Sequence, residues 1–200
     1  LTGPTIALAM SKLQHRFPNS GGLRNPAHQS LLQHPYDTRP GVQIIHIQPH
    51  HWICIPFLQP GVVLVADSLA DPDSPTTSAV RTALDNMDSC GHACLLNTHM
   101  LSRTIVHIKV PRQSGDLDCG LFALAYATAW LHGLDPREIS LDHPSLRPHL
   151  PSWLSPESST PASPFPRNNP LGINTLDPYH HAQLTPTHPT PPTHHTPNTT

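Results

Sequence analysis

The sequence predicts a mixed domain in which helices pack on an antiparallel meander of strands. Three short runs rich in β-branched and apolar residues, 42–47, 52–57 and 62–66, are joined by tight polar connections, which is typical of consecutive antiparallel strands. A longer run, 121–131, is nearly all apolar and follows a polar loop that ends in Asp-Cys-Gly. This pattern predicts a helix that is buried on most of its surface.

The first half of the chain begins with an amphipathic helix. Apolar residues recur at helical spacing over residues 5–17, and Pro18 with the Asn-Ser-Gly-Gly after it ends the pattern. Residues 23–40 contain three prolines and are expected to form loops and short turns. The runs 52–57 and 62–66 are apolar on both faces, so we expect them in the middle of the sheet with both sides covered.

The second half continues the sheet and adds helices. After the turn-rich residues 71–77, Ser78 is placed to cap a helix, and residues 105–110 form a further strand. The buried helix follows, with Asp118 or its neighbour as a candidate cap and Gly133 as the residue that stops it.

The folded domain is expected to occupy residues 1–154 and to be followed by a disordered tail. A small terminal turn or helix is expected at 141–150, and the domain should end near Trp153. Residues 155–200 are mostly Pro, Thr, Ser, Asn and His, so they cannot bury enough surface to offset an ordering entropy of about 1–2 kcal/mol per residue. Because the chain begins with Leu1 rather than Met, we expect the domain to be truncated at its N-terminus.

Composition argues against several classes of function. The formal net charge is −2, and no basic run interleaved with aromatic residues is present, which disfavours nucleic-acid binding. No run approaches the ~18 consecutive apolar residues of a membrane span, and the N-terminus has no basic segment followed by an apolar one. The four cysteines are too few and too irregularly spaced for a disulfide framework, which agrees with a reducing, intracellular compartment.

The sequence predicts neither a metal site nor a cofactor. The segment Cys90-Gly91-His92-Ala93-Cys94 has the spacing of half a zinc site, but no second pair of suitable spacing accompanies it in the region expected to fold. Paired histidines at 180–181 and 194–195 lie in the tail, where a flexible chain offers no fixed ligand geometry.

Cys119 is the candidate nucleophile. It stands at the predicted N-terminus of the buried helix, where unpaired backbone N–H groups and the helix dipole favour a thiolate over a thiol. The alternative is a structural cysteine, since free cysteine is among the most buried residue types. Thiol catalysis also needs a base, a group that orients the base and donors for the oxyanion, so residues elsewhere in the chain must decide.

Three residues are candidates for these tasks. His51 precedes Trp52 at the start of the second strand, and Asp67 follows the third strand, so neighbouring strands would bring an acceptor level with the imidazole. Gln113 can place an amide donor beside the Cys119 N–H to form an oxyanion hole. Taken singly, such residues are more often surface histidines, turn formers or solvated amides. Their joint order favours catalysis.

The order His-Trp, Asp-Ser-Leu, Gln-Ser-Gly and Asp-Cys-Gly-Leu-Phe-Ala resembles the ubiquitin-like-protein-specific cysteine proteases, the SUMO-protease family related to adenovirus protease. The similarity covers about residues 6–150 and is closest to divergent copies found within mobile elements. It implies a papain-like α+β fold in which the cysteine helix packs against a mostly antiparallel sheet. It also implies four roles: His51 as general base, Asp67 as its orienting group, Gln113 in the oxyanion hole and Cys119 as nucleophile.

The resemblance implies a thiol-dependent peptidase or isopeptidase that cleaves after the C-terminal Gly-Gly of a SUMO-like modifier or its conjugates. The expected partner is a ubiquitin-like modifier, and the expected location is the nucleus or cytoplasm. Two alternatives stay open: an inactive mobile-element remnant that still binds a ubiquitin-like protein, and a thiol acyltransferase on the same fold. The intact set of four residues argues against the remnant, whereas hydrolysis and acyl transfer share the same acyl-enzyme.

Overall fold

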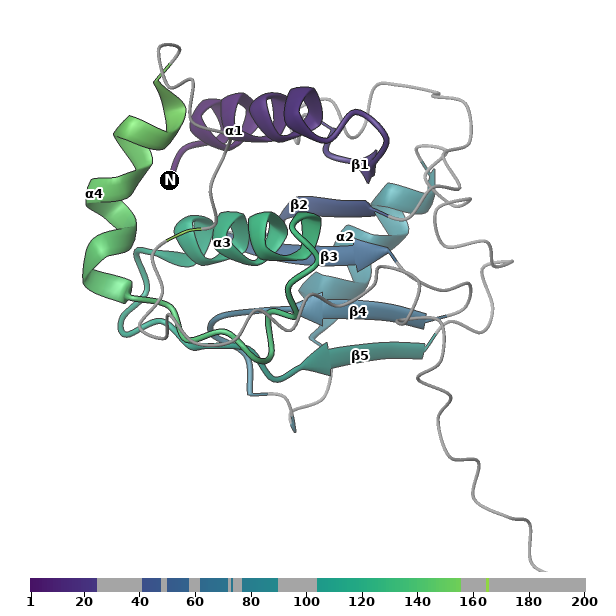
Figure 1. Cartoon of the computed structure of the whole chain (residues 1–200). Coiled ribbons are helices and arrows are strands. Elements are labelled where there is room, and N and C mark those ends of the chain that lie inside the picture. Colours follow the sequence, from purple (N-terminus) through teal and green to yellow (C-terminus); the bar gives the residue numbers. More distant parts are fainter. Residues whose placement is uncertain are drawn as a thin grey trace, which may run out of the picture.

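The computed structural model describes residues 1–24, 41–47, 50–57, 62–71, 73, 77–89, 104–155 and 165. Figure 1 shows the helices and strands of this part of the chain. In chain order they are α1 (Gly3–Arg16), β1 (Gly21–Gly22), β2 (Gly41–Ile47), β3 (His51–Phe57), β4 (Val62–Ala66), α2 (Ser78–Ser89), β5 (Thr104–Ile108), α3 (Cys119–Leu131) and α4 (His143–Leu154).

The strands form one five-stranded sheet in the order β1-β2-β3-β4-β5. The predicted meander is present, because β2 pairs with β3 and β3 with β4, both antiparallel. At the two edges, β1 runs parallel to β2 and β5 runs parallel to β4. The β3–β4 register places Cys54 opposite Ala66, so the start of β3 and the end of β4 meet at the same end of the sheet.

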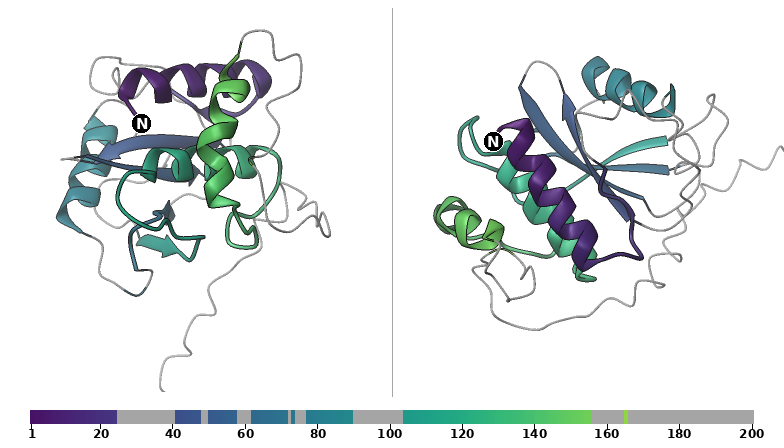
Figure 2. Two further views of the ribbon diagram at one scale, coloured as in Figure 1. Left: turned by 90° about the vertical axis from the view of Figure 1, so that its left-hand side faces the viewer. Right: turned by 90° about the horizontal axis from the view of Figure 1, so that it is seen from above.

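Helices cover both faces of the sheet, as the view from above in Figure 2 shows: α2 lies on one face, and α1, α3 and α4 lie on the other. Alternate strand residues separate into two buried clusters accordingly. In β3, Trp52 and Cys54 join the cluster on the α3 side, whereas Ile53 and Ile55 join the cluster with α2. The prediction of a central strand covered on both faces is therefore confirmed for β3.

Helix α3 lies between the sheet and the other two helices of its face (Figures 1 and 2). All of its residues from Cys119 to Ala129 are buried, in agreement with the nearly uniform apolar pattern. Packing at its first turn is close, because a Cβ added at Gly120 would lie 3.0 Å from Cβ of Leu1. The Leu1 carbonyl also accepts a hydrogen bond of 3.2 Å from the indole N–H of Trp52.

The predicted cap of α2 is wrong, whereas the predicted stop of α3 is confirmed. Thr77, not Ser78, caps α2, because its Oγ1 accepts the backbone N–H of Val80 at 3.3 Å. Asp118 occupies the N-cap position of α3 but makes no side-chain capping bond; its carboxylate is bound elsewhere, as described below. Gly133 follows the end of α3 with φ +72°, a conformation that glycine adopts without steric cost.

Strand β1 occupies glycines that the sequence pattern assigns to the end of the first helix. Gly21 pairs with Gly41 at the start of β2, and a Cβ on Gly41 would lie 1.9 Å from the Gly21 carbonyl oxygen. Only glycine permits the two strands to approach so closely. The glycines that were expected to end the first helix therefore also form an edge of the sheet. Most of the loop predicted at 23–40 lies outside the described residues.

Helix α4 closes the described part of the fold and is longer than the predicted terminal segment. Lys12 of α1 donates to the carbonyl oxygens of Trp153 at 2.6 Å and Ser155 at 2.7 Å, which satisfies acceptors at the end of α4. Phe165 packs on Trp153 with ring centroids 5.5 Å apart. The rest of the segment 156–200 lies outside the described residues, so the division into a domain and a tail stays a prediction.

Within the described part of the chain, no helix has the length and apolarity needed to cross a membrane. The same residues contain no group of three or more His, Cys, Asp or Glu side chains positioned to hold a metal ion. The segment 90–94, with its zinc-like spacing, lies outside the described residues.

Candidate active site

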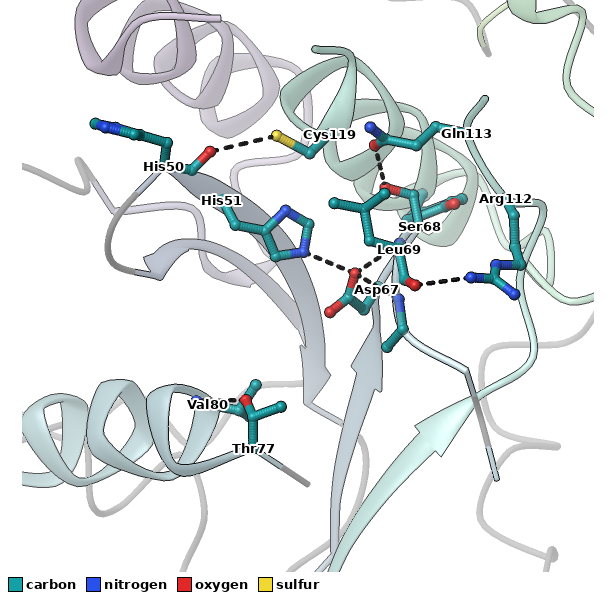
Figure 3. A network of polar contacts seen from close by, with 12 residues as sticks. His50, His51, Asp67, Ser68, Leu69, Thr77, Val80, Arg112, Gln113 and Cys119 are labelled. Carbon is teal, nitrogen blue, oxygen red and sulfur yellow. Dashed lines mark hydrogen bonds and ion pairs between the residues drawn. The ribbon is translucent and has the colours of Figure 1, made fainter. Parts of the chain in front are cut away.

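Cys119 is the first residue of α3, at the end of the sheet where β3 begins (Figure 3). Its side chain is buried, and its thiol lies 3.9 Å from the carbonyl oxygen of His50. The helix supplies this position because the first backbone N–H groups of an α-helix have no partners within the helix. A sulfur here therefore meets donors that stabilise negative charge.

His51 and Asp67 form a short hydrogen bond across neighbouring strands (Figure 3). Nε2 of His51 lies 2.7 Å from Oδ1 of Asp67, as expected for residues that start β3 and follow β4. The same Oδ1 accepts the backbone N–H groups of Leu69 at 2.8 Å and Ala70 at 3.2 Å. These backbone hydrogen bonds hold the Asp67 carboxylate in place, and the carboxylate holds the His51 imidazole.

The second ring nitrogen of His51 is available to the sulfur. Nδ1 is buried and makes no hydrogen bond of ordinary geometry within the described residues. Figure 3 shows it on the side of the ring that faces Cys119. An imidazole held at Nε2 by a carboxylate and facing a thiol with Nδ1 can move a proton to and from the sulfur.

The electrostatics favour an ion pair between this histidine and this cysteine. Burial by itself would lower the pKa of His51, but the interactions with Asp67 and with Cys119 outweigh it and raise the pKa to about 9. Burial would raise the pKa of Cys119, but His51 and the backbone N–H groups of Trp52 and Gly120 lower it below that of an ordinary thiol. The pKa of Asp67 is also lowered against the effect of its burial, chiefly by His51. These shifts favour a thiolate–imidazolium pair beside the Asp67 carboxylate over the neutral thiol and imidazole.

Gln113 lies beside Cys119 in the loop that precedes α3 (Figure 3). Its backbone N–H donates to the Ser68 carbonyl at 3.2 Å, and its Oε1 accepts the Ser68 hydroxyl at 2.6 Å. One Nε2 hydrogen is donated to the carbonyl of Gly115 at 2.6 Å. An amide nitrogen carries two hydrogens, so the other remains to stabilise an oxyanion together with the Cys119 N–H.

The loop around Gln113 is anchored on both sides. Arg112 donates to the Leu69 carbonyl at 2.8 Å, which ties the loop to the turn after β4. The hydroxyl of Tyr126, buried within α3, donates to the Pro111 carbonyl. The fold thus brings all four predicted residues to one end of the sheet, although their catalytic roles stay predictions.

Sequence reasoning missed a cluster that ties this loop to α4. The Asp118 carboxylate contacts Nε2 of His143 at 2.9 Å and pairs with the Arg147 guanidinium. Nδ1 of the same histidine lies 3.1 Å from the Ser114 hydroxyl. These partners are 25 to 29 residues apart in sequence, so no local pattern could have found them.

Comparison with known proteins was made by sequence and by structure. No protein-family model and no curated protein matches the chain. Among solved structures, the C-terminal Ulp1 protease domain in complex with Smt3, the yeast ortholog of SUMO, superposes with a TM-score of 0.51 at 15% identity, covering 68% of this chain and 67% of that one. The SUMO protease Ulp1 with its catalytic cysteine oxidized to a sulfinic acid gives the same TM-score and identity, covering 68% of each chain.

The chain has the papain-like α+β fold of the Ulp1 protease domain. At 15% identity the likeness shows the fold alone. It confirms the predicted fold class, including the packing of the cysteine helix against the central strands. The named structures are SUMO proteases, one of them bound to a SUMO ortholog. The activity of this chain must therefore be argued from its own residues.

Proposed function

We propose that the protein is a thiol-dependent peptidase or isopeptidase that cleaves after the C-terminal Gly-Gly of a SUMO-like modifier or its conjugates. The observation that carries the proposal is the His51–Asp67 hydrogen bond of 2.7 Å beside a cysteine of lowered pKa at a helix N-terminus. A buried structural cysteine needs none of these partners. The other described free cysteine, Cys54, has none of them, and burial raises its pKa.

Acylation would begin with the Cys119 thiolate attacking the carbonyl carbon of the modifier's last glycine. The carbonyl electron pair moves to oxygen, and the resulting oxyanion accepts hydrogen bonds from the Cys119 N–H and from Nε2 of Gln113. His51 then gives its Nδ1 proton to the leaving amine as the C–N bond breaks. A thioester with Cys119 remains, and Asp67 holds the neutral imidazole in place.

Deacylation would repeat these roles with water. His51, now neutral, takes a proton from the attacking water, and the second tetrahedral intermediate uses the same two donors. Collapse breaks the C–S bond and restores the thiolate beside the imidazolium. The reaction consumes one water and releases the modifier with a free carboxylate.

The preference for glycine is assigned to Trp52. Its indole is held by the Leu1 carbonyl at 3.2 Å and by the His46 ring, whose centroid lies 4.7 Å away. A side chain held on two sides is rigid. Because the backbone N–H of Trp52 lies at the Cys119 sulfur, we place the indole beside the path to the nucleophile, where a substrate Cβ would clash. A modifier ending in Ala-Ala should therefore be cleaved much more slowly than one ending in Gly-Gly; equal rates would remove Trp52 from this role.

The likeness to a protease domain bound to a SUMO ortholog supports a ubiquitin-like modifier as the partner. The test is covalent capture by the full chain, with SUMO and ubiquitin each carrying a thiol-reactive group at the C-terminus. We expect an adduct with SUMO that is lost in Cys119→Ala and kept in Cys54→Ala, the matched control for removing a buried thiol. No adduct with either modifier, from chain shown to be folded, would contradict the proposal; an adduct with ubiquitin alone would change the substrate.

A further inference from the structure

Ser68 is buried between the two halves of the candidate active site. It directly follows Asp67 at the end of β4 and is 1% exposed. Its hydroxyl donates to Oε1 of Gln113 at 2.6 Å, and its carbonyl accepts the Gln113 backbone N–H at 3.2 Å. One residue thus holds both the backbone and the side chain of the predicted oxyanion-hole glutamine (Figure 3).

A glutamine needs such a partner because the two ends of its amide have nearly the same shape and opposite polarity. Rotating the amide by about 180° would turn an oxygen toward a developing oxyanion, and the repulsion would reverse the intended effect. An oxyanion hole that uses Gln113 therefore requires a device that selects one orientation.

The Gly115 carbonyl selects the orientation of the Gln113 amide, and the Ser68 hydroxyl holds the amide oxygen in it. Nε2 donates to the Gly115 carbonyl at 2.6 Å, and a carbonyl can only accept, so the nitrogen must lie on that side. The Ser68 hydroxyl meets the oxygen and must act as donor. In the rotated amide, Oε1 would face the Gly115 carbonyl oxygen without a hydrogen between them. The rotated form is disfavoured in this buried setting, because Gln113 is only 8% exposed.

We propose that Ser68 is a positioning residue that holds the Gln113 amide in the orientation selected by the Gly115 carbonyl and so keeps an Nε2 hydrogen directed at the oxyanion. The inference rests on the proposed function, since it assigns a role within the same site. It also gives a reason for the adjacent pair Asp67-Ser68: one turn after β4 orients the base through Asp67 and the oxyanion donor through Ser68. Because Asp67 and Ser68 are adjacent in this turn, the base and the oxyanion donor are held in a fixed position relative to each other.

The expected effects on kcat and KM depend on the stage of the reaction at which the oxyanion is present. Because it forms only on the way to the transition state, weakening its donor lowers kcat and leaves KM nearly unchanged. Loss of one oxyanion donor typically costs about 10²–10³-fold in kcat. We expect a smaller loss of about 10-fold in Ser68→Ala, since the Gly115 contact remains. Alkylation of Cys119 by iodoacetamide creates no oxyanion, so its rate should be unchanged.

A double-mutant cycle on the full chain tests the assignment, with SUMO carrying a fluorogenic amide at its C-terminal glycine as substrate. We expect kcat to fall about 10-fold in Ser68→Ala and about 100-fold in Gln113→Ala, and the double variant to match Gln113→Ala. If kcat of the double variant is instead a further 10-fold below that of Gln113→Ala, the two residues act independently, and the inference is wrong. Thr128→Val is the matched control: it removes another buried hydroxyl, bonded to the Leu124 carbonyl at 2.7 Å, and should leave kcat unchanged.

A second readout separates this inference from the proposed function. If the wild-type chain cleaves neither SUMO nor ubiquitin, the proposed function fails, and the positioning role is tested by NMR of the Gln113 side-chain amide, assigned by its loss in Gln113→Ala. We expect the Nε2 proton that is donated to Gly115 to exchange slowly with solvent in the wild type and at least about 10-fold faster in Ser68→Ala, since a buried, hydrogen-bonded amide proton is protected. Unchanged exchange would overturn the role of Ser68.

Discussion

The two faces of the sheet bury different kinds of side chain. The face covered by α2 buries an aliphatic cluster: Ile45, Ile47, Ile53, Ile55, Val63, Val65, Val80 and Leu84. The face covered by α3 mixes aliphatic residues with Trp52, Phe122, Tyr126, Met10 and two cysteines. At its edge, the polar side chains of Asp67, Ser68 and Gln113 are buried as well.

Strand alternation is what keeps these two environments apart. Successive residues of β3 point to opposite faces, so Trp52 and Ile53 are adjacent in sequence but belong to different clusters. Buried polar groups cost free energy unless each is hydrogen-bonded. The buried polar groups of the candidate site lie at the α3 face, whereas the aliphatic cluster on the α2 face stabilises the sheet by apolar burial. Changes on the two faces should therefore affect different properties of the protein.

The largest effect is expected on the α3 face, from His51→Ala. Removing the group that carries the proton to the leaving amine should lower kcat by about 10⁴-fold, the upper range for general acid–base catalysis, with little loss of thermal stability. Cleavage of the SUMO substrate and the melting temperature measure the two quantities. His15→Ala on the exposed side of α1 is the control. A rate within 10-fold of the wild type would remove His51 from the mechanism.

On the α2 face the effect should be on stability instead. Ile53 is fully buried, and Ile53→Ala should lower the free energy of unfolding by about 3 kcal/mol through lost burial and a cavity. Urea denaturation measures this, with Val106→Ala as the control, because Val106 is 39% exposed and should change stability by under about 0.5 kcal/mol. The folded variant should alkylate Cys119 at the wild-type rate; a slower rate would show that the two faces are coupled.

A smaller effect is expected where the site meets α4. Asp118→Asn removes the charge that pairs with Arg147 and contacts His143, which loosens the loop between Gln113 and Cys119. We expect kcat to fall about 10-fold, since misplacement by a fraction of an ångström slows an oriented reaction. Arg147→Gln should give part of this loss. A kinetic effect from neither variant would show that the loop is held by Ser68, Arg112 and Tyr126 alone.

The smallest effect is a pH dependence that becomes visible only when the ion pair is broken. The pKa of His51 is raised to about 9 in the fold, so its stabilisation is full below its unfolded value near 6.5 and is lost as the pH rises through 9. Cys119 has a lowered pKa and contributes the opposite slope, which is gained as the pH rises. The two slopes have opposite signs, so they offset each other in the wild type wherever both groups titrate.

In Cys119→Ala only the histidine slope is left, because Asp67 still raises the pKa of His51. Its free energy of unfolding should fall by on the order of 1 kcal/mol between pH 6.5 and 9 relative to the wild type. Urea titrations at several pH values measure this difference. Parallel curves for the two proteins would mean that Asp67 alone does not raise the pKa of His51 in the absence of Cys119.

Much of the fold and the site follows from local sequence pattern. The β-branched runs predict β2, β3 and β4, and the apolar run after Asp-Cys-Gly predicts α3, because burial imposes periods of two and of about 3.6 residues. These elements alone place His51 at the start of a strand and Cys119 at the start of a helix. Few local backbone conformations are possible at the end of a strand or at the N-terminus of a helix, so the positions of these two residues can be predicted from the local sequence.

Other features were not predictable, and each depends on residues far apart in the chain. The parallel edge pairings of β1 and β5 depend on which strands meet after a long connection. The cap of α2 is Thr77 rather than Ser78, a difference of one residue set by where the helix begins. Asp118 looked like a cap because its position is right, but His143 and Arg147 compete for its carboxylate and bind it.

Local sequence pattern was enough to predict the strands of the meander, the helix that begins at Cys119 and the four candidate residues of the site. Tertiary structure alone decided how those residues are held: which nitrogen of His51 faces Cys119, which end of the Gln113 amide meets Ser68, and what binds Asp118. The physical reason is that hydrophobic periodicity is local and is repeated along the chain, so many residues report it. A hydrogen bond depends on one donor and one acceptor meeting within a few tenths of an ångström, and only the folded chain brings them together.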